Sequence, residues 1–366
     1  MKSIRVGIIG AGWGQLQIEA FKRSRGLQVT ALCDVDAARA KEIARKHNLD
    51  RVYVDYHDLI ACEQVDLVSI ATPPAFHPPM VRAALEMDKA VLVEKPLALN
   101  EGDARDLLRL AESRHAVHAV DLQMRFLPAL AYAKELIEEQ YLGQLFRVDV
   151  TMIAEHPWGE HGKWAAEDAA GGGVLMELGT HFIDALLWLF GPVDAVLAER
   201  RTHFRTARGA KSKSKGVAQI PMSVTGDDAF WSIMRFAGGG DALLNFVTGA
   251  RHDPGWTISA YGSVGSLVIQ SGSLLGMRDG DREMAILPIP KRLELGNDPQ
   301  DPLMWGMTKL GELLAAKLRR DHDVLPYPDF RDGVAVAKVV DAVRQSSVEH
   351  GWVNLGLKLA ASPVLA

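Results

Sequence analysis

Cysteine is scarce in this sequence. Cys33 and Cys62 are the two among 366 residues, and both lie in the first half of the chain. Two cysteines provide neither a framework of paired disulfides nor the cysteine spacing of a zinc site. This scarcity predicts a protein of a reducing compartment, the cytoplasm.

The sequence also lacks long apolar runs and a strong excess of one charge. No apolar run approaches the roughly 18 residues that span a membrane, and Met1-Lys2 leads directly into a strand-like segment without a signal region. Lys and Arg number 41 against 46 Asp and Glu, a net charge of -5. These features predict no membrane partner and no nucleic-acid partner.

The chain is long enough for two domains, because single cores usually stop growing near about 250 to 300 residues. In the first part, strands alternate with helices. Strands are predicted at 4–9, 29–33, 65–70, 90–93 and 116–120, with helices at 15–23, 37–47, 79–87 and 101–113 between them. This alternation predicts an α/β Rossmann domain with a doubly wound parallel sheet over residues 1–122.

The pattern changes after residue 122. A linking helix at 126–140 is followed by period-two segments at 145–154, 230–236, 241–248, 256–261 and 266–270, separated by glycine-rich turns. Period-two alternation is typical of strands with one buried face. We therefore predict a C-terminal α+β domain over residues 123–366, with a large open, mainly antiparallel sheet that serves substrate binding and oligomerisation.

A glycine-rich turn, Gly-Ala-Gly-Trp-Gly at residues 10–14, joins the first strand to the first helix. Glycines let the backbone turn sharply and its N–H groups approach a pyrophosphate at a helix N-terminus. The G-x-G-x-x-G spacing expects glycine at Gln15, so the turn alone is weak evidence. We predict cofactor contacts from Gly10, Gly12, Trp13, Gly14 and Gln15.

Asp34 ends the second strand, twenty residues after Gly14. An acid at this place accepts hydrogen bonds from an adenosine ribose, which strengthens the interpretation of the turn. A carboxylate repels a 2′-phosphate, so NAD is the preferred cofactor, while Arg39 keeps NADP possible. The alternative is that Asp34 caps the helix at 37–47.

The run Glu94-Lys95-Pro96 ends a buried parallel strand, and ligands of such sheets lie beyond the strands' carboxyl ends. The proline stops the strand and holds the charged pair at a fixed corner, although solvated charges at a strand end are the simpler alternative. Thr72 and Pro73 end the preceding strand, where they would wall a nicotinamide pocket. His77 is either a further cofactor contact or an ordinary residue near a helix start.

A third pattern lies in the second half, where three glycines at 171–173 open a helix that ends at 190. Glu177, His181 and Asp184 fall on one face at i, i+4 and i+7, away from an apolar stripe. A histidine flanked by carboxylates is typical of a tuned acid/base, and a core histidine paired with Asp184 is the alternative. A metal site that adds His156 or His161 lacks the H-E-x-x-H spacing, so we predict no metal.

Residues 200–215 hold seven Lys or Arg and no acid. An exposed mobile loop is the simplest interpretation, and a lid that attracts anions is the alternative.

These motifs together resemble the glucose-fructose oxidoreductase, inositol dehydrogenase and rhizopine-catabolism (Gfo/Idh/MocA) family over almost the whole chain. The matching motifs are Gly10-Ala11-Gly12 with Asp34, Thr72-Pro73 with His77, Glu94-Lys95-Pro96, Arg125-Phe126 with Pro128, Lys163-Trp164, residues 171–184, Tyr261 to Ser266, and Asp332-Gly333.

The resemblance implies an NAD(P)-dependent oxidoreductase that acts on a CH–OH group of a sugar, cyclitol or related polyhydroxylated compound. Lys95 matches the lysine that positions the substrate hydroxyl and the nicotinamide, and His181 matches the catalytic histidine. Glu177 stands where many members have aspartate, and we assign it to catalysis as well. Arg125, Trp164, Glu177 and Asp184 are predicted substrate contacts. An NAD-retaining hydrolase or lyase and a non-catalytic NAD-binding regulator are the alternatives.

Family members are commonly dimers or tetramers, so we expect a homodimer or homotetramer. The open sheet carries Phe230, Trp231, Phe246 and Trp256 among its strands, and we expect these aromatic residues to support self-association.

Overall fold

The computed structural model describes residues 3–155, 163–208, 221–294 and 301–356. The chain forms two compact units: Met1–Leu127 with Leu295–Ala337, and Pro128–Glu294 with Lys338–Ala366. We predicted contiguous domains, 1–122 and 123–366, whereas in the structure the chain leaves the first unit at Leu127 and returns to it at Leu295.

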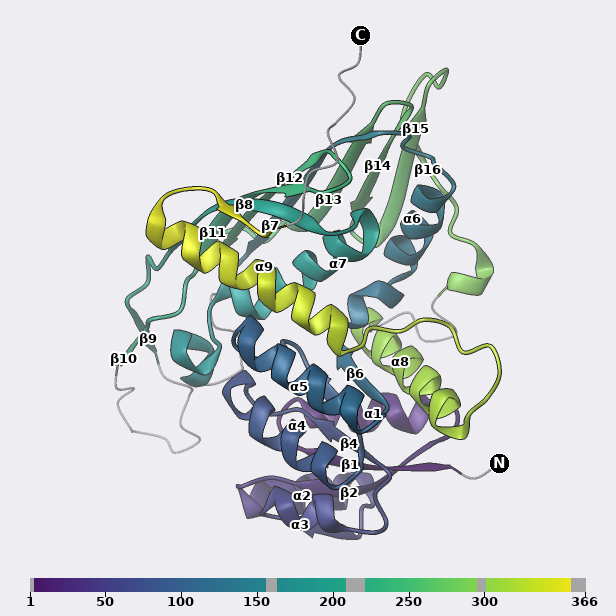
Figure 1. The fold of residues 1–366 in the computed structure, drawn as a ribbon, viewed down its shortest axis with the longest axis vertical. Helices are drawn as coiled ribbons and strands as arrows, with labels where there is room; N and C mark the ends of the chain where they lie inside the picture. The colour runs from purple at the N-terminus through teal and green to yellow at the C-terminus, as the bar shows by residue number, and fades with distance from the viewer. Residues whose placement is uncertain (1–2, 156–162, 209–220, 295–300, 357–366) are drawn as a thin grey trace. The chain divides into compact units, whose positions relative to one another are not determined.

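The first unit contains a six-stranded parallel sheet with the order β3-β2-β1-β4-β5-β6 (Figure 1). Its strands are β1 (Ile4–Ile9), β2 (Leu27–Cys33), β3 (Arg51–Tyr53), β4 (Leu67–Ile70), β5 (Ala90–Glu94) and β6 (His118–Asp121). Its helices are α1 (Gly14–Arg23), α2 (Ala37–His47), α3 (Tyr56–Ala61), α4 (His77–Glu86), α5 (Glu101–Ser113), α8 (Pro302–Arg319) and the start of α9 (Phe330–Glu349). The predicted doubly wound parallel sheet is confirmed.

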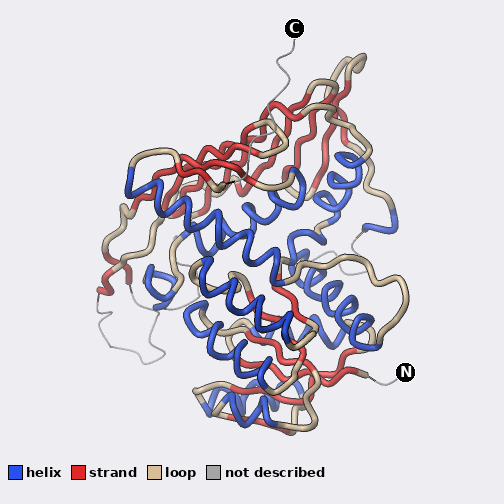
Figure 2. The backbone as a smooth tube through the Cα atoms, in the orientation of Figure 1, coloured by secondary structure: helices blue, strands red, loops and turns tan. Residues whose placement is uncertain are grey.

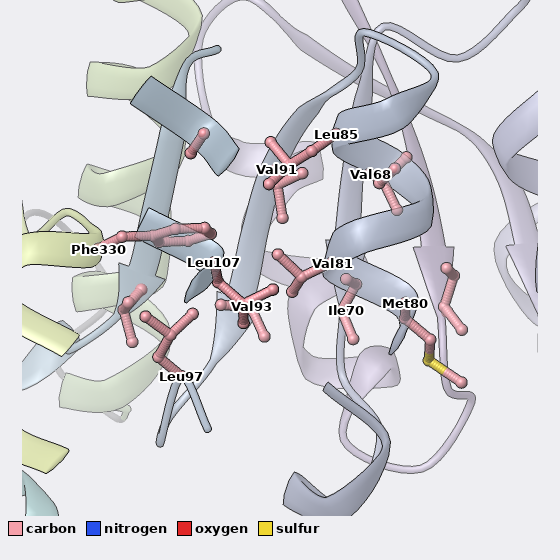
Figure 3. Close-up of a cluster of buried hydrophobic side chains, with 14 of the residues drawn as sticks. Val68, Ile70, Met80, Val81, Leu85, Val91, Val93, Leu97, Leu107 and Phe330 are labelled. Atoms are coloured by element: carbon pink, nitrogen blue, oxygen red, sulfur yellow. The ribbon is translucent and has the colours of Figure 1, made fainter. Parts of the chain in front are cut away.

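Apolar side chains fill both faces of this sheet. On one face, residues of β4 and β5 pack against α4, α5 and Phe330 (Figure 3). On the other, Met307, Leu310 and Leu314 of α8 join the core formed by β1, β2 and α1. Each such side chain contributes roughly 1.5–3 kcal/mol by burial, which explains why α8 belongs to the first unit although it follows the second in sequence.

The helix caps separate two acids that the sequence places close together. Asp36 caps α2, where its side chain accepts hydrogen bonds from the N–H groups of Ala38 and Arg39, both at 3.1 Å. Asp34 is therefore not the cap and lies at the end of β2. Asn100 caps α5, where its side-chain oxygen accepts a hydrogen bond from the Asp103 N–H at 2.9 Å.

The second unit is built on a nine-stranded sheet with the order β16-β15-β14-β13-β7-β12-β11-β8-β17. Its strands are β7 (Leu145–Ala154), β8 (Val193–Arg201), β11 (Ala229–Phe236), β12 (Asp241–Thr248), β13 (Gly255–Gly262), β14 (Gly265–Gln270), β15 (Ser273–Arg278), β16 (Ala285–Ile286) and β17 (Val353–Asn354). All neighbours pair antiparallel except β7 and β12, which are parallel, so the predicted mainly antiparallel sheet is confirmed.

Helices α6 (Pro128–Glu138) and α7 (Thr180–Phe190) lie along one face of this sheet (Figure 2). Phe230 and Phe246 stack on that face with ring centroids 4.6 Å apart, and Phe182 of α7 meets Phe246 and Trp256 edge-on. Phe230, Phe246 and Trp256 therefore lie on the face that the helices cover, and placing them on the open face was wrong. Alternate strand residues point to opposite faces, and Trp231, at 45% exposure, lies on the outer one.

The basic stretch is more structured than expected. Arg200 and Arg201 end β8, and Thr206–Arg208 forms β9, which pairs with β10 (Pro221–Ser223). Residues 202–205 are a mostly exposed loop, as predicted, whereas the flanking strands were not predicted. Positions 209–220 lie outside the described residues.

One segment of the second unit, Asp168–Phe190, is long and apolar enough to cross a membrane by length and composition, with a mean hydropathy of 1.4. Of its apolar window, 67% is buried within the structure. Core helices of globular units share these properties, so the segment is weak evidence for a membrane span.

Candidate active site

Each glycine of the turn after β1 has its own steric reason. Gly10 has a φ of +102°, and a Cβ there would lie 2.5 Å from the Ala71 carbonyl oxygen. A Cβ on Gly14 would lie 2.9 Å from Ile8, so Gly14 allows the close packing of α1 on β1. A Cβ on Gly12 would meet no atom within 4 Å, which leaves that backbone open to a ligand.

This arrangement explains the departure from the usual spacing. The helix–strand packing that the third glycine normally permits takes place at Gly14 instead of position 15. Gln15 can therefore carry a side chain, and its amide donates to the Ala11 carbonyl at 3.2 Å. The structure thus gives Gln15 a bond within the turn, and its cofactor contact stays a prediction.

Asp34 is tied to the same turn. Its carboxylate is buried and accepts hydrogen bonds from the N–H groups of Ala11 at 2.7 Å and Asp36 at 2.8 Å. Arg39, whose side chain is 47% exposed, reaches both carboxylate oxygens at 2.7 and 2.9 Å. A ribose diol at this position would compete with Arg39 for the carboxylate.

His77 braces two loops at the carboxyl end of the sheet. It is fully buried, with Nδ1 2.7 Å from the Pro96 carbonyl oxygen and Nε2 2.8 Å from that of Thr72. Burial lowers the pKa of His77 to about 4, so the ring is neutral at pH 7. A neutral ring has one N–H and donates to one of these two carbonyl oxygens, and both ring nitrogens face the backbone of Thr72 and Pro96 rather than a ligand.

The charged pair after β5 has two different environments. Glu94 is buried, and its Oε1 accepts a hydrogen bond from the Gln17 amide at 2.9 Å. Burial raises the pKa of this carboxyl group, whereas Gln17 and Trp13, a predicted cofactor contact, act together to lower it. Lys95 is half-buried. Glu94 thus lies inside the unit against α1, and Lys95 reaches the surface.

The carboxyl edge of this sheet fits a dinucleotide. In the strand order, β1 lies between β2 and β4, so the chain direction of the crossovers reverses at the glycine turn. The turn leads into the N-terminus of α1 beside the open backbone of Gly12, with Asp34 on one side and the Lys95 corner on the other. This is the arrangement in which doubly wound sheets bind a pyrophosphate and its two nucleosides.

The glycine block of the second unit permits close backbone packing. A Cβ on Gly172 would lie 2.2 Å from the Ala165 carbonyl oxygen, and one on Gly173, with φ +98°, would lie 2.3 Å from Asp227 Oδ1. The Gly173 N–H also donates to the Ala165 carbonyl at 2.9 Å. The turn that carries Trp164 is therefore held against the start of the segment with Glu177 and His181.

The predicted face of three polar residues is interrupted. Residues Leu175–Gly179 form a π-helical turn before α7, and such turns change the angular spacing of side chains. Glu177 and His181 are half-buried, whereas Asp184 is 1% exposed. None of the three is without an interaction partner. The i, i+4, i+7 spacing therefore does not bring all three to one equally exposed face, and Asp184 lies on the buried side.

Asp227, which the sequence gave no reason to single out, anchors this segment. Its Oδ2 accepts the Leu175 N–H at 3.0 Å, and its Oδ1 accepts from Arg200 at 2.9 Å. Arg200 also pairs with Asp168 at 2.5 Å. A buried carboxylate of β11's leading loop thus sets the start of the helix that carries His181. No local pattern marks it, because its partners lie 27 or more residues away.

Arg125 has a partner within the first unit. Its side chain is 10% exposed and pairs with Asp332 at 2.7 Å, near the start of α9. This ion pair joins two segments 207 residues apart in sequence. Substrate binding by Arg125 and Trp164 stays a prediction.

No three His, Cys, Asp or Glu side chains gather as metal ligands within the part of the chain that the structure describes. The two histidines considered as additional ligands, His156 and His161, lie outside the described residues.

Comparison with known families decides the class. A model of an oxidoreductase family with an NAD-binding Rossmann fold matches residues 4–122, and a model of the GFO/IDH/MocA C-terminal domain matches residues 130–268. The chain belongs to the Gfo/Idh/MocA oxidoreductase family. Its first unit is thus an NAD-binding Rossmann fold, and the resemblance inferred from the motifs is confirmed.

Relatives match along nearly the full length. An uncharacterised oxidoreductase of Synechocystis sp. is 28% identical over 374 residues, covering 96% of each chain. Levoglucosan dehydrogenase of Pseudarthrobacter phenanthrenivorans is 25% identical over 393 residues, covering 97% of this chain and 99% of that protein. The solved structure of levoglucosan dehydrogenase in complex with NADH and levoglucosan has the same fold, with a TM-score of 0.84 at 23% identity, covering 97% and 100% of the two chains.

Proposed function

We propose that this protein is an NAD-preferring dehydrogenase or reductase that transfers a hydride between the nicotinamide and a secondary alcohol or ketone of a sugar, cyclitol or related polyhydroxylated compound. The observation that carries the proposal is the open glycine turn with the Asp34 carboxylate bonded to it, in a member of this oxidoreductase family. The sugar substrate is supported by relatives named levoglucosan dehydrogenase and D-apiose dehydrogenase.

The cofactor supplies the hydride acceptor, held by the turn and by Asp34. Oxidation of an alcohol also requires its hydroxyl proton to leave, and an imidazole with an ordinary pKa of about 6.5 accepts a proton at neutral pH. His181 is the residue we assign to this step. The ammonium of Lys95 stabilises the developing alkoxide charge, and Glu177 orients the histidine from the preceding turn.

Screening settles the reaction class. Purified protein is incubated with NAD⁺ and a panel of sugars, sugar acids and cyclitols, and with NADH and the corresponding ketones, while nicotinamide absorbance is followed. Turnover of at least one of these compounds with net NADH formation or consumption is expected. If glycosides are cleaved with no net change in NADH, the protein is the NAD-retaining hydrolase or lyase instead. NADH binding without turnover of any compound favours the regulator.

A further inference from the structure

A buried polar network joins β4, α1 and the end of β5, next to Lys95. The Ser69 hydroxyl on β4 donates to the Gln17 side-chain oxygen at 2.7 Å, and the Gln17 amide on α1 donates to Glu94 on β5 at 2.9 Å. Ser69 and Gln17 are both fully buried. The network continues to β6, where Asp121 is the Cα partner of Glu94 in the parallel pairing.

Two carboxyl groups therefore lie side by side in the interior. Glu94 is 6% exposed and Asp121 0%. Among the described residues, neither carboxylate oxygen of Asp121 has a hydrogen-bond donor. The neighbouring Glu94 carboxyl group can bond to one of these oxygens, and a hydrogen bond between two carboxyl groups requires a proton on one of them.

Electrostatics also favours a pair that carries one proton. Burial raises the pKa of both groups, and the neighbouring Glu94 raises the pKa of Asp121 further. Lys95 is the charged group that acts in the opposite direction on both. Two buried carboxylates in contact cannot both stay ionised, so the pair titrates as one unit.

The pair lies at the end of β5, on the far side of β4 from the glycine turn. If Asp34 held the ribose and the turn the pyrophosphate, the nicotinamide would be placed on the β5 side. Glu94 ends β5, directly before Lys95, and its carboxyl group accepts a hydrogen bond from Gln17 of α1, the helix that follows the turn. The acid pair is thus connected to α1 on one side and to Lys95 on the other.

We propose that Glu94 and Asp121 share one proton in the cofactor-free protein and that binding of the oxidised cofactor, with its positively charged nicotinamide, releases this proton to solvent. The carboxyl O–H bond breaks, its electron pair stays on the carboxylate, and the proton goes to the buffer. The charge of the ring offsets the second negative charge that appears beside it. The reduced cofactor has an uncharged ring, so its binding leaves the proton in place.

This inference rests on cofactor binding by the proposed enzyme, and it makes Asp121 a positioning residue that acts through Glu94. Proton release links affinity to pH. Where one full proton leaves, the affinity for NAD⁺ rises up to about tenfold per pH unit, while the affinity for NADH does not follow. The pair thus shifts the balance between the two cofactor forms toward NAD⁺ as the pH rises.

Calorimetric titration measures the released proton without turnover. NAD⁺ and NADH are titrated into the full-length protein in buffers of different ionisation enthalpy, at several pH values near neutrality. The slope of the observed enthalpy against buffer ionisation enthalpy gives the number of protons exchanged. We expect release with NAD⁺ and none with NADH. Asp121→Asn, which leaves Glu94 ionised with no shared proton, should abolish the release.

Asp66→Asn is the matched control. Asp66 immediately precedes β4 and lies at the amino ends of the parallel strands, whereas Glu94 and Asp121 lie at their carboxyl ends. Asp66 pairs with Arg5 at 2.6 Å, so this variant should release the proton as the wild type does. Absence of release from the wild type with NAD⁺ would overturn the proposal. Release that persists in Asp121→Asn would overturn it as well, because the proton would then come from another group, such as Lys95.

A second measurement covers the possibility that Asp121→Asn binds no cofactor. Because folding raises the pKa of the pair, its contribution to stability is present at acidic pH and is lost as pH rises through the folded-state pKa. The free energy of unfolding of Asp121→Asn relative to wild type should therefore increase from pH 5 to pH 9. A pH-independent difference contradicts the shared proton. Both measurements are independent of whether any sugar is oxidised, so failure of the proposed function leaves them interpretable.

Discussion

Single residues carry the proposed chemistry. Lys95 belongs to the first unit and His181 to the second, and both are half-buried rather than solvated. The proposed acid/base therefore consists of groups whose surroundings are set by the fold.

Replacing either group tests the assignment. Lys95→Ala and His181→Ala should each lower turnover by about 10² to 10⁴, the usual cost of a lost acid/base. The double variant should be little worse than either single one, because residues that act as a unit are non-additive. Steady-state kinetics with the substrate found by screening measures both effects.

The exposed His252 provides the control, and His252→Ala should keep turnover near that of wild type. NADH affinity should hardly change in His181→Ala. Retention of turnover within about a factor of three in His181→Ala, with the same pH profile, would remove the histidine from the mechanism, since a lost acid/base usually costs about a hundredfold or more.

We expect one residue, Asp34, to determine the preference for NAD over NADP. Asp34→Asn keeps the shape of the side chain but removes the charge that attracts ribose hydroxyls and repels a 2′-phosphate. We expect NADH to bind about ten- to a hundredfold more weakly, since hydrogen bonds to charged groups contribute about 1.5–3 kcal/mol. Fluorescence titration of NADH and NADPH measures the change.

Asp36→Asn is the matched control, two residues away, because asparagine caps a helix as well as aspartate does and Asp36 holds only α2. Tighter binding of NADPH than NADH by the wild type would mean that Arg39, rather than Asp34, determines the choice.

At the scale of elements, two glycines of the turn between β1 and α1 have different surroundings. A side chain on Gly10 meets the Ala71 carbonyl and an unfavourable φ, whereas a side chain on Gly12 meets open space. The two glycines, two residues apart, therefore serve the fold and the ligand respectively.

Alanine at each position tests this division. Gly10→Ala should lower the free energy of unfolding by on the order of 3 kcal/mol, from strain and overpacking. Gly12→Ala should change it by less than about 1 kcal/mol, yet weaken NADH binding because the methyl group fills the approach to the backbone. Chemical denaturation and NADH titration of both variants provide the comparison. Equal loss of stability in the two would contradict the structure.

At the scale of the whole molecule, the outer face of the large sheet carries apolar residues. Ile233 of β11 and Leu243 of β12 are paired in register and half-buried on this face, beside exposed Trp231. Apolar residues on a broad open sheet favour self-association. We propose that this face, which contains Trp231 but not Phe230, Phe246 or Trp256, forms a homodimer or homotetramer interface.

Ile233→Glu should convert the assembly to a monomer of 40.0 kDa, because it places a charge in the apolar face. Gln345→Glu adds the same charge on the exposed side of α9 and should leave the assembly intact. Light scattering across the micromolar range measures both. A wild-type protein that is monomeric throughout this range would rule out the interface.

The sequence alone predicted the fold class, the family and several candidate site residues. The alternation of strands and helices, the glycine turn, Asp34 and the run ending in Lys95 all depend on residues within one or two neighbouring elements. Hydrophobic period and turn chemistry are local properties, so they predicted the Rossmann fold and the family. The departure from the usual glycine spacing at Gln15 was visible in the sequence, but its reason, the packing of Gly14 on Ile8, was not.

The tertiary structure decided what depends on residues far apart in sequence. It returned α8 to the first unit, aligned β7 parallel to β12, and turned Phe230 and Phe246 toward the helices. It also brought Asp121 beside Glu94 and tied Asp227 to the start of the helix with His181. Strand order and register set these contacts, and a local pattern contains neither, because each pairing is selected by the burial and hydrogen bonding of the whole unit.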